Sequence, residues 1–279
     1  MKTFITAFTL LLVCTLQAQN FTGKAIYKTS QKSNFKMNNE KGVDDKMQEE
    51  LRKRIQKMYQ KTFILEFDKT TSTYKEDIKL EEPKPQVGGN NVVVMSFGGS
   101  GAASVYYKNI QEKRFANQTE IMGKVFLVKD SLPKYDWQMT TETKNIGQYT
   151  CYKATYTEEV ESKKISIVNG ETKEDVKKET KVTTAWYTLQ VPINNGPDNY
   201  QGLPGLILEI NDGKRMIVCT EIVLNPSEKI TIQEPAKGKV VNQNKFDEIQ
   251  EQKSKEMMEK FKSRNGFDMG NGVQVKIGG

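Results

Sequence analysis

The chain has 279 residues, with 42 Lys and Arg, 35 Asp and Glu and no histidine, and its formal net charge is +7. The lack of histidine excludes a Ser-His-Asp or Cys-His catalytic system and any metal site with a histidine ligand. Acidic and basic residues are interspersed, which is typical of a solvated surface, whereas nucleic-acid-binding proteins cluster basic and aromatic residues. We therefore expect no nucleic-acid partner, no metal and no cofactor.

The first 19 residues have the order of a secretory signal peptide. Lys2 forms a short basic region, an apolar region runs from Phe4 to Leu16, and a cleavage site follows Ala18 or Gln19. An uncleaved N-terminal membrane anchor is the alternative, but the apolar region is too short to span a bilayer comfortably. No other apolar run is long enough to span a membrane, so we predict an exported protein without a membrane span after cleavage.

The remaining sequence shows no linker-like shift in composition. We therefore predict a single β-rich domain at 20–262, followed by a Gly-rich flexible tail at 263–279. Alternating apolar and polar residues predict a succession of short strands. These strands are expected at 21–28, 63–68, 71–75, 104–110, 114–119, 124–128, 136–139, 149–156, 183–191, 206–210, 215–224 and 230–232.

Two segments have helical periodicity. One runs from Val43 to Tyr59, and the other from an N-cap at Asn244, with Asp247 completing a capping box, to about Phe261. Because the strands follow one another without helices between them, we predict an α+β protein: a large curved antiparallel β-sheet packed with one or two helices. Such a sheet can curl into a half-barrel like that of periplasmic lipoprotein carriers, which is an analogy of fold.

Two further segments interrupt the strands. The Gly-rich segment from Val87 to Ser104 predicts a flexible hairpin insertion, with a mobile flap as the alternative. The charged segment from Glu158 to Lys181 predicts a projecting hairpin.

The most specific motif is Gly202-Leu203-Pro204-Gly205-Leu206-Ile207, in which a tight turn leads into a strand. Proline lacks an N–H and suits a turn, while glycine permits positive φ or close approach of two backbones. Together with Trp186-Tyr187, Val191-Pro192-Ile193 and the segment from Ile146 to Ala154, the motif resembles the GLPGLI family of Gram-negative envelope proteins. The resemblance implies a β-rich fold and a location in the periplasm or at the outer membrane, but no chemistry.

Aromatic side chains near this motif are the candidate ligand-binding residues. Large aromatic side chains line apolar pockets, but they also fill cores, so both interpretations stay open. The candidates are Trp137, Tyr149, Trp186, Tyr187 and Tyr200.

Two other features concern covalent chemistry. Cys151 and Cys219 remain after signal cleavage, and they either form a disulfide or lie apart as buried thiols. Asp130-Ser131-Leu132 resembles a short O-glycosylation acceptor pattern of some Gram-negative envelopes, so Ser131 is a candidate modification site.

Three functions are compatible with these observations. The first is non-enzymatic binding of an apolar ligand, lipid or polypeptide on the concave face of the sheet. The second is a scaffold or interaction component of an outer-membrane assembly, acting through the charged hairpin. The third is a hydrolase that uses two carboxylates, for which Glu209, Asp212 and Glu221 have no distinguishing spacing. A deep cavity beneath Trp186 and Leu203 would favour a carrier, and a filled core would favour a scaffold.

Overall fold

The computed structural model describes residues 21–31, 49, 60–78, 104–168, 171–264 and 274–276. The predicted signal peptide lies outside these residues. So do the Gly-rich segment before Ser104 and, apart from Glu49, the helix predicted from Val43 to Tyr59.

The described residues form thirteen strands and the helix α3 (Gln243–Arg264). The strands are β1 (Gly23–Gln31), β2 (Thr62–Phe67), β3 (Thr71–Glu76), β4 (Val105–Asn109), β5 (Arg114–Ile121), β6 (Lys124–Ser131), β7 (Gln138–Ile146), β8 (Tyr149–Val168), β9 (Glu171–Thr188), β10 (Leu206–Asn211), β11 (Arg215–Leu224), β12 (Lys239–Val241) and β13 (Gln274–Lys276).

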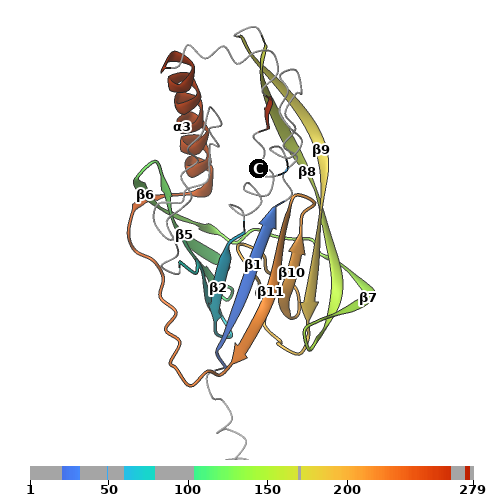
Figure 1. Ribbon diagram of the computed structural model, residues 1–279. Coiled ribbons are helices and arrows are strands. Elements are labelled where there is room, and N and C mark those ends of the chain that lie inside the picture. The colour runs from blue at the N-terminus through green and yellow to red at the C-terminus, as the bar shows by residue number, and fades with distance from the viewer. Residues whose placement is uncertain are drawn as a thin grey trace, which may run out of the picture.

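The strands form one open, strongly bent sheet (Figure 1). Twelve of them follow the order β12-β6-β5-β4-β3-β2-β1-β11-β10-β9-β8-β13, and β7 pairs with β8 beside this path. The first strand, β1, lies inside the sheet between β2, the next strand in sequence, and β11, which comes much later in the chain.

The predicted α+β class with an antiparallel, half-barrel sheet is wrong. The described chain is mainly β, and its sheet is open and mixed, because β12 runs parallel to β6 while the other pairs are antiparallel. The parallel pair forms because residues 225–238 carry the chain from β11 across to the far edge of the sheet, where it enters in the direction of β6. Helix α3 packs at β6, where the rings of Phe246 and Phe126 lie 5.7 Å apart.

The start of α3 also differs from the prediction. Asn242, not Asn244, is the N-cap, and its Oδ1 accepts the N–H of Lys245 at 2.9 Å. A lysine at the third helical position cannot complete a capping box. Asp247 instead accepts a hydrogen bond from the Gln243 side chain at 2.7 Å.

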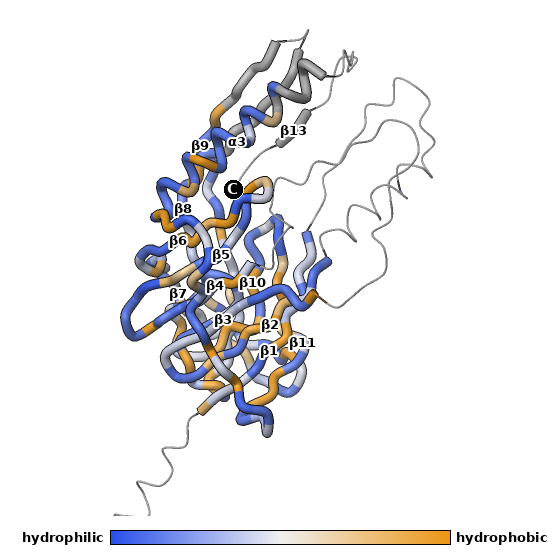
Figure 2. The backbone as a smooth tube through the Cα atoms, turned by 90° about the vertical axis from the view of Figure 1, so that its left-hand side faces the viewer, coloured by the Kyte–Doolittle hydropathy of each residue, from blue (hydrophilic) through white to orange (hydrophobic). Residues whose placement is uncertain are grey.

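The main core lies on the inner side of the bend. Alternation along β1 buries Ala25 and Tyr27, and alternation along β2 buries Leu65 and Phe67. Figure 2 shows apolar segments in β1, β2, β10 and β11 and a mostly hydrophilic α3. None of the helices in the described part of the chain is long and apolar enough to cross a bilayer.

A second, smaller core lies on the other face of β4, β5 and β6. It consists of Tyr107, Ala116 and Leu127, against which Ile232 packs. The strand predicted at 230–232 is therefore wrong, because this segment covers the sheet without joining it. Glu234 fastens the segment with ion pairs to Arg114 and Lys129, each at 2.8 Å.

The strands β8 and β9 form a hairpin whose outer part projects beyond the rest of the sheet (Figure 1). Their register is continuous from Tyr152 paired with Tyr187 to Val168 paired with Glu171, which confirms the hairpin predicted from the charged segment. We call residues 156–168 and 171–183 the arm.

Gly205 provides a test of the turn that precedes β10. A Cβ atom at this position would lie 2.1 Å from the backbone oxygen of Thr188, so Gly205→Ala forces two backbone segments apart. We expect a loss of about 3 kcal/mol in the free energy of unfolding. Pro204 is exposed, so Pro204→Ala is the matched control, with an expected loss below about 1 kcal/mol. Equal losses in denaturant titrations would contradict this role for Gly205.

Candidate functional site

A buried lysine fixes the connection between β9 and β10, residues 189–205, which we call the motif loop. Lys108 on β4 is fully buried, and its Nζ donates hydrogen bonds to three backbone oxygens of this loop. The acceptors are Gly196 at 2.6 Å, Asp198 at 2.7 Å and Tyr200 at 3.2 Å. These three bonds replace the water that an ammonium group would otherwise need.

The motif loop and the first residues of β10 make further polar contacts across the inner side of the sheet. The Tyr27 hydroxyl donates to the backbone oxygen of Ile207 at 2.8 Å, and Ser72 Oγ lies 3.4 Å from Asn195 Oδ1. Leu203 of the motif is 1% exposed. The inner side of the bend, where an apolar ligand was expected, is therefore filled by the chain's own loop.

Burial lowers the pKa of Lys108 to about 7, and the nearby Asp198 carboxylate partly offsets this effect. Asp198 itself forms an ion pair with Arg215 on β11 at 3.0 Å. It has a positive φ of 55°, which directs its backbone oxygen to Lys108 and its carboxylate to Arg215. Asp198 thus joins the buried lysine to groups nearer the surface.

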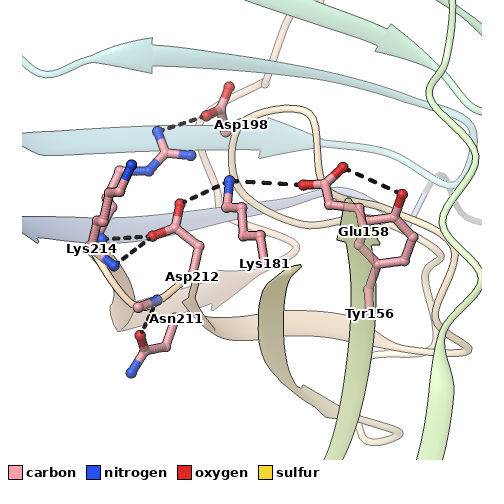
Figure 3. Close-up of polar contacts among 9 residues, drawn as sticks. Tyr156, Glu158, Lys181, Asp198, Asn211, Asp212 and Lys214 are labelled. Atoms are coloured by element: carbon pink, nitrogen blue, oxygen red, sulfur yellow. Dashed lines mark hydrogen bonds and ion pairs between the residues drawn. The ribbon is translucent and has the colours of Figure 1, made fainter. Parts of the chain in front are cut away.

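Polar contacts continue from Arg215 to the base of the arm, and Figure 3 shows Asp212, Lys181 and Glu158 among them. The backbone N–H of Arg215 donates to Asp212 Oδ1 at 2.6 Å, and the other oxygen of Asp212 lies 3.6 Å from Lys181 Nζ. Lys181 also lies 3.8 Å from Glu158, which is paired with it across the arm. We call Asp198, Arg215, Asp212, Lys181 and Glu158 the arm-root network. It holds the base of the arm against the β10–β11 turn.

Aromatic rings pack beside this network. Tyr135 lies at the centre, 5.3 Å from Trp137, 5.2 Å from Tyr156 and 5.5 Å from Tyr200 between ring centroids. The Trp137 Nε1 donates to the backbone oxygen of Gln201 at 2.8 Å, which ties the cluster to the motif loop. At these distances the rings fill the space between them, so they stabilise the loop and leave no room for a ligand among them.

The five predicted aromatic residues do not meet at one place. Trp137 and Tyr200 lie together, with centroids 6.4 Å apart. Tyr187 is buried and packs on Tyr152 at 6.0 Å, and Tyr149 is half-buried against the main core. Trp186 is elsewhere, beneath the Lys144 ammonium at 4.4 Å from its ring centroid.

Sequence reasoning missed Lys108, Tyr135 and Tyr156. A signal for Lys108 was present, because strand alternation places it on the same face as Tyr106, a core residue. A lysine at an inward-facing position needs polar partners, and the loop with the GLPGLI motif supplies them. For Tyr135 and Tyr156, strand order was required.

Two of the three carboxylates predicted as hydrolase candidates, Glu209 and Asp212, have lysine partners. Both oxygens of Glu209 lie within 2.8 Å of Lys144 Nζ, and Asp212 lies beside Lys181. Glu221 is exposed. Although burial acts in the opposite direction, hydrogen bonds lower the pKa of Asp68, Asp130 and Glu234, so these three carboxyl groups stay ionised near neutral pH.

Both cysteines are buried free thiols in this structure. Burial raises the pKa of Cys151 to about 11 and that of Cys219 to about 12, so both are protonated near neutral pH. Ser131 is exposed. Its neighbour Asp130 accepts the backbone N–H of Ser131 at 2.7 Å and that of Gln243 at 3.1 Å, which fixes the start of α3 to β6.

A family model described as "Protein of unknown function (Porph_ging)" matches residues 137–209, from just before β7 into β10. The chain is also similar to two crystal structures of PNGF-II, in space groups C2 and P21, with sequence identities of 13% and 14% and a TM-score of 0.47 for each. These matches cover 84% and 83% of this chain but 33% of each solved chain, so the protein spans about a third of their length. Among curated proteins, no match is found.

Lys108→Met tests the buried ammonium. Methionine has a similar length but no N–H, so three loop carbonyls lose their donor, and we expect a loss of about 2–3 kcal/mol in the free energy of unfolding at pH 7. The folded lysine has a pKa of about 7, below the value of roughly 10.4 for an unfolded lysine. The unfolded chain therefore binds more protons between these values, and the wild type gains stability as pH rises, by up to about 1.4 kcal/mol per pH unit.

The measurement is chemical denaturation of both proteins at pH 7.5, 8.5 and 9.5. The deficit of the methionine variant should widen as pH rises, because only the wild type has this proton linkage. The range stops at 9.5 because burial raises the pKa of Tyr27 and Tyr74, and these groups make stability fall once unfolded tyrosines ionise. Parallel stability curves for the two proteins would contradict the lowered pKa of Lys108.

Proposed function

We propose that this protein is an exported, non-enzymatic component of the cell envelope that contacts another protein through the arm. Membership of the GLPGLI family and an envelope location are part of this proposal. They are supported by the motif at Gly202–Ile207, by the N-terminal apolar segment and by the match to a family of unknown function over the same region.

The observation that carries this proposal is the arm, which is anchored at its base and open along one edge. Lys181 contacts both Glu158 and Asp212, so the base is held by charges from two parts of the sheet. β10 pairs with β9 only from Thr184 to Thr188. From Glu171 to Thr183, no other strand of the described chain pairs with β9 on that side. An anchored ribbon that no further strand of the described chain extends on one side is suited to bind another polypeptide by strand addition.

The filled inner side of the sheet favours this function over an apolar-ligand carrier. Val191, Ile193 and Leu203 occupy the space beneath the GLPGLI corner, and Lys108 holds the loop in place. A ligand there would have to displace buried apolar side chains and leave an ammonium group without acceptors. The ion-paired states of Glu209 and Asp212 likewise give no support to a carboxylate hydrolase.

The test is a protein with a shortened arm. Residues 161–178 are replaced by Asn-Gly, which joins the register pair Val160 and Glu179 through a tight turn and keeps Glu158 and Lys181. No described residue of 161–178 belongs to the main core, and of the described strands outside the arm only the three-residue β13 pairs with it, so the free energy of unfolding should change by less than about 1 kcal/mol. The short-arm protein should lose the envelope partner that the full chain binds.

Binding is measured with a photoreactive residue at Val176, which is 48% exposed on the arm, in the full chain incubated with envelope extract. The control carries the same group at Val240, which is 63% exposed on β12 at the opposite edge of the sheet. A defined envelope protein should be crosslinked from position 176 and not from 240, and unlabelled full chain, but not short-arm protein, should compete. Equal crosslinking from both positions would refute the proposal.

A further inference from the structure

The outer part of β9 has an antisymmetric charge pattern. Residues 171–181 read Glu-Thr-Lys-Glu-Asp-Val-Lys-Lys-Glu-Thr-Lys, with Val176 at the centre. Each acidic residue on one side of Val176 matches a basic residue at the same distance on the other side, and each basic residue matches an acidic one. The matching positions are Asp175 and Lys177, Glu174 and Lys178, Lys173 and Glu179, Thr172 and Thr180, and Glu171 and Lys181.

The register with β8 does not have this symmetry. Of the eight charged residues from 171 to 181, three are in register with a β8 residue of opposite charge, at Asp175–Lys164, Lys178–Glu161 and Lys181–Glu158. The other five are in register with an uncharged β8 residue, as Lys173 is with Ser166 and Glu179 with Val160. An antiparallel pairing of this strand with a copy of itself, centred on Val176, places all eight opposite an unlike charge.

The edge needed for such pairing is open in the described part of the chain. One edge of β9 is bonded to β8 along the arm, while β10 covers the other edge from Thr184 to Thr188. Val176 is 48% exposed, so an uncharged side chain is accessible at the centre of symmetry. Unpaired strand edges extend a sheet readily, and opposite charges across two strands favour one register over its neighbours.

We propose that two copies of this chain associate through the outer edges of their β9 strands, antiparallel, with Val176 on the twofold axis. The two arms then form one four-stranded ribbon in which unlike charges face each other across the new strand pair. A one-residue or two-residue shift of register brings like charges together, so the pattern selects this register. This inference rests on the proposed function, because it takes the arm as a contact surface, and it identifies a second copy as a partner.

Disulfide trapping tests the register directly. In Val176→Cys the two new thiols face each other across the axis, where opposite Cα atoms lie about 5 Å apart, within the reach of a disulfide. Val182→Cys is the matched control, because Val182 is 49% exposed on the same strand. In the proposed pair its two copies are about 40 Å apart. Under mild oxidation of the full chain, the Val176→Cys protein should form the covalent dimer at least about tenfold faster than the control. Equal rates, or no covalent dimer from either protein, would overturn the register.

Charge exchange provides a second test that keeps the three opposite-charge register pairs of the hairpin. Glu179→Lys and Lys173→Glu each change a residue whose register partner on β8 is uncharged, Val160 or Ser166. Either variant alone sets two like-charge pairs in its homodimer, and its dissociation constant by analytical ultracentrifugation should rise by about tenfold or more. An equimolar mixture restores unlike charges and should form a heterodimer with wild-type affinity. If the mixture binds no better than either variant alone, the pairing is wrong.

The two proposals fail separately. If the short-arm protein loses its envelope partner while disulfides form equally fast at positions 176 and 182, the proposed function stands and the proposed self-association is refuted. If disulfides form selectively at position 176 but no envelope protein is crosslinked from that position, the proposed self-association stands and the proposed function is refuted.

Discussion

The ammonium group of Lys108 is the constraint on which the site depends. A fully buried lysine must have its N–H groups accepted, and here three carbonyl oxygens of the motif loop accept them. The loop therefore has to bring Gly196, Asp198 and Tyr200 to one point on the inner side of β4. This requirement draws the segment before the GLPGLI corner into the bend of the sheet, and the space that a ligand would occupy becomes core. The same loop then positions Asp198 to pair with Arg215, whose backbone N–H donates to Asp212, and Asp212 pairs with Lys181 at the base of the arm.

Much of the local structure could be predicted from the sequence. Strand positions follow from alternation, as in β1, where Ala25 and Tyr27 point inward. The tight corner at Gly205 follows from residue type, and the space available there confirms that a side chain would not fit. The arm was recognisable because its charged residues offered no apolar face to bury. In each case the deciding information lies within a few neighbouring residues.

The remaining features depend on which strands become neighbours. The parallel pair of β12 and β6 involves three residues at Lys239–Val241, too few to give a periodic signal. Asn242 and Asn244 are equivalent as caps by residue type, and α3 starts after Asn242, where Asp130 on β6 accepts the N–H of Gln243. The sequence predicts Trp186 and Tyr187 as residues of one pocket, but neighbours in a strand point to opposite faces, so strand geometry alone argues against a shared pocket.

The place of β1 in the sheet has a consequence for how the molecule folds. This strand, the earliest in the described chain, is bonded on one side to β2 and on the other to β11, which follows almost every other strand in sequence. The middle of the sheet thus stays incomplete until residues 215–224 have been synthesised, and closing it requires contacts between distant parts of the chain. Folding rates fall as the mean sequence separation of contacts rises. We therefore expect slow folding, in which β1 keeps an unpaired edge until late and needs protection from association with other chains in the meantime.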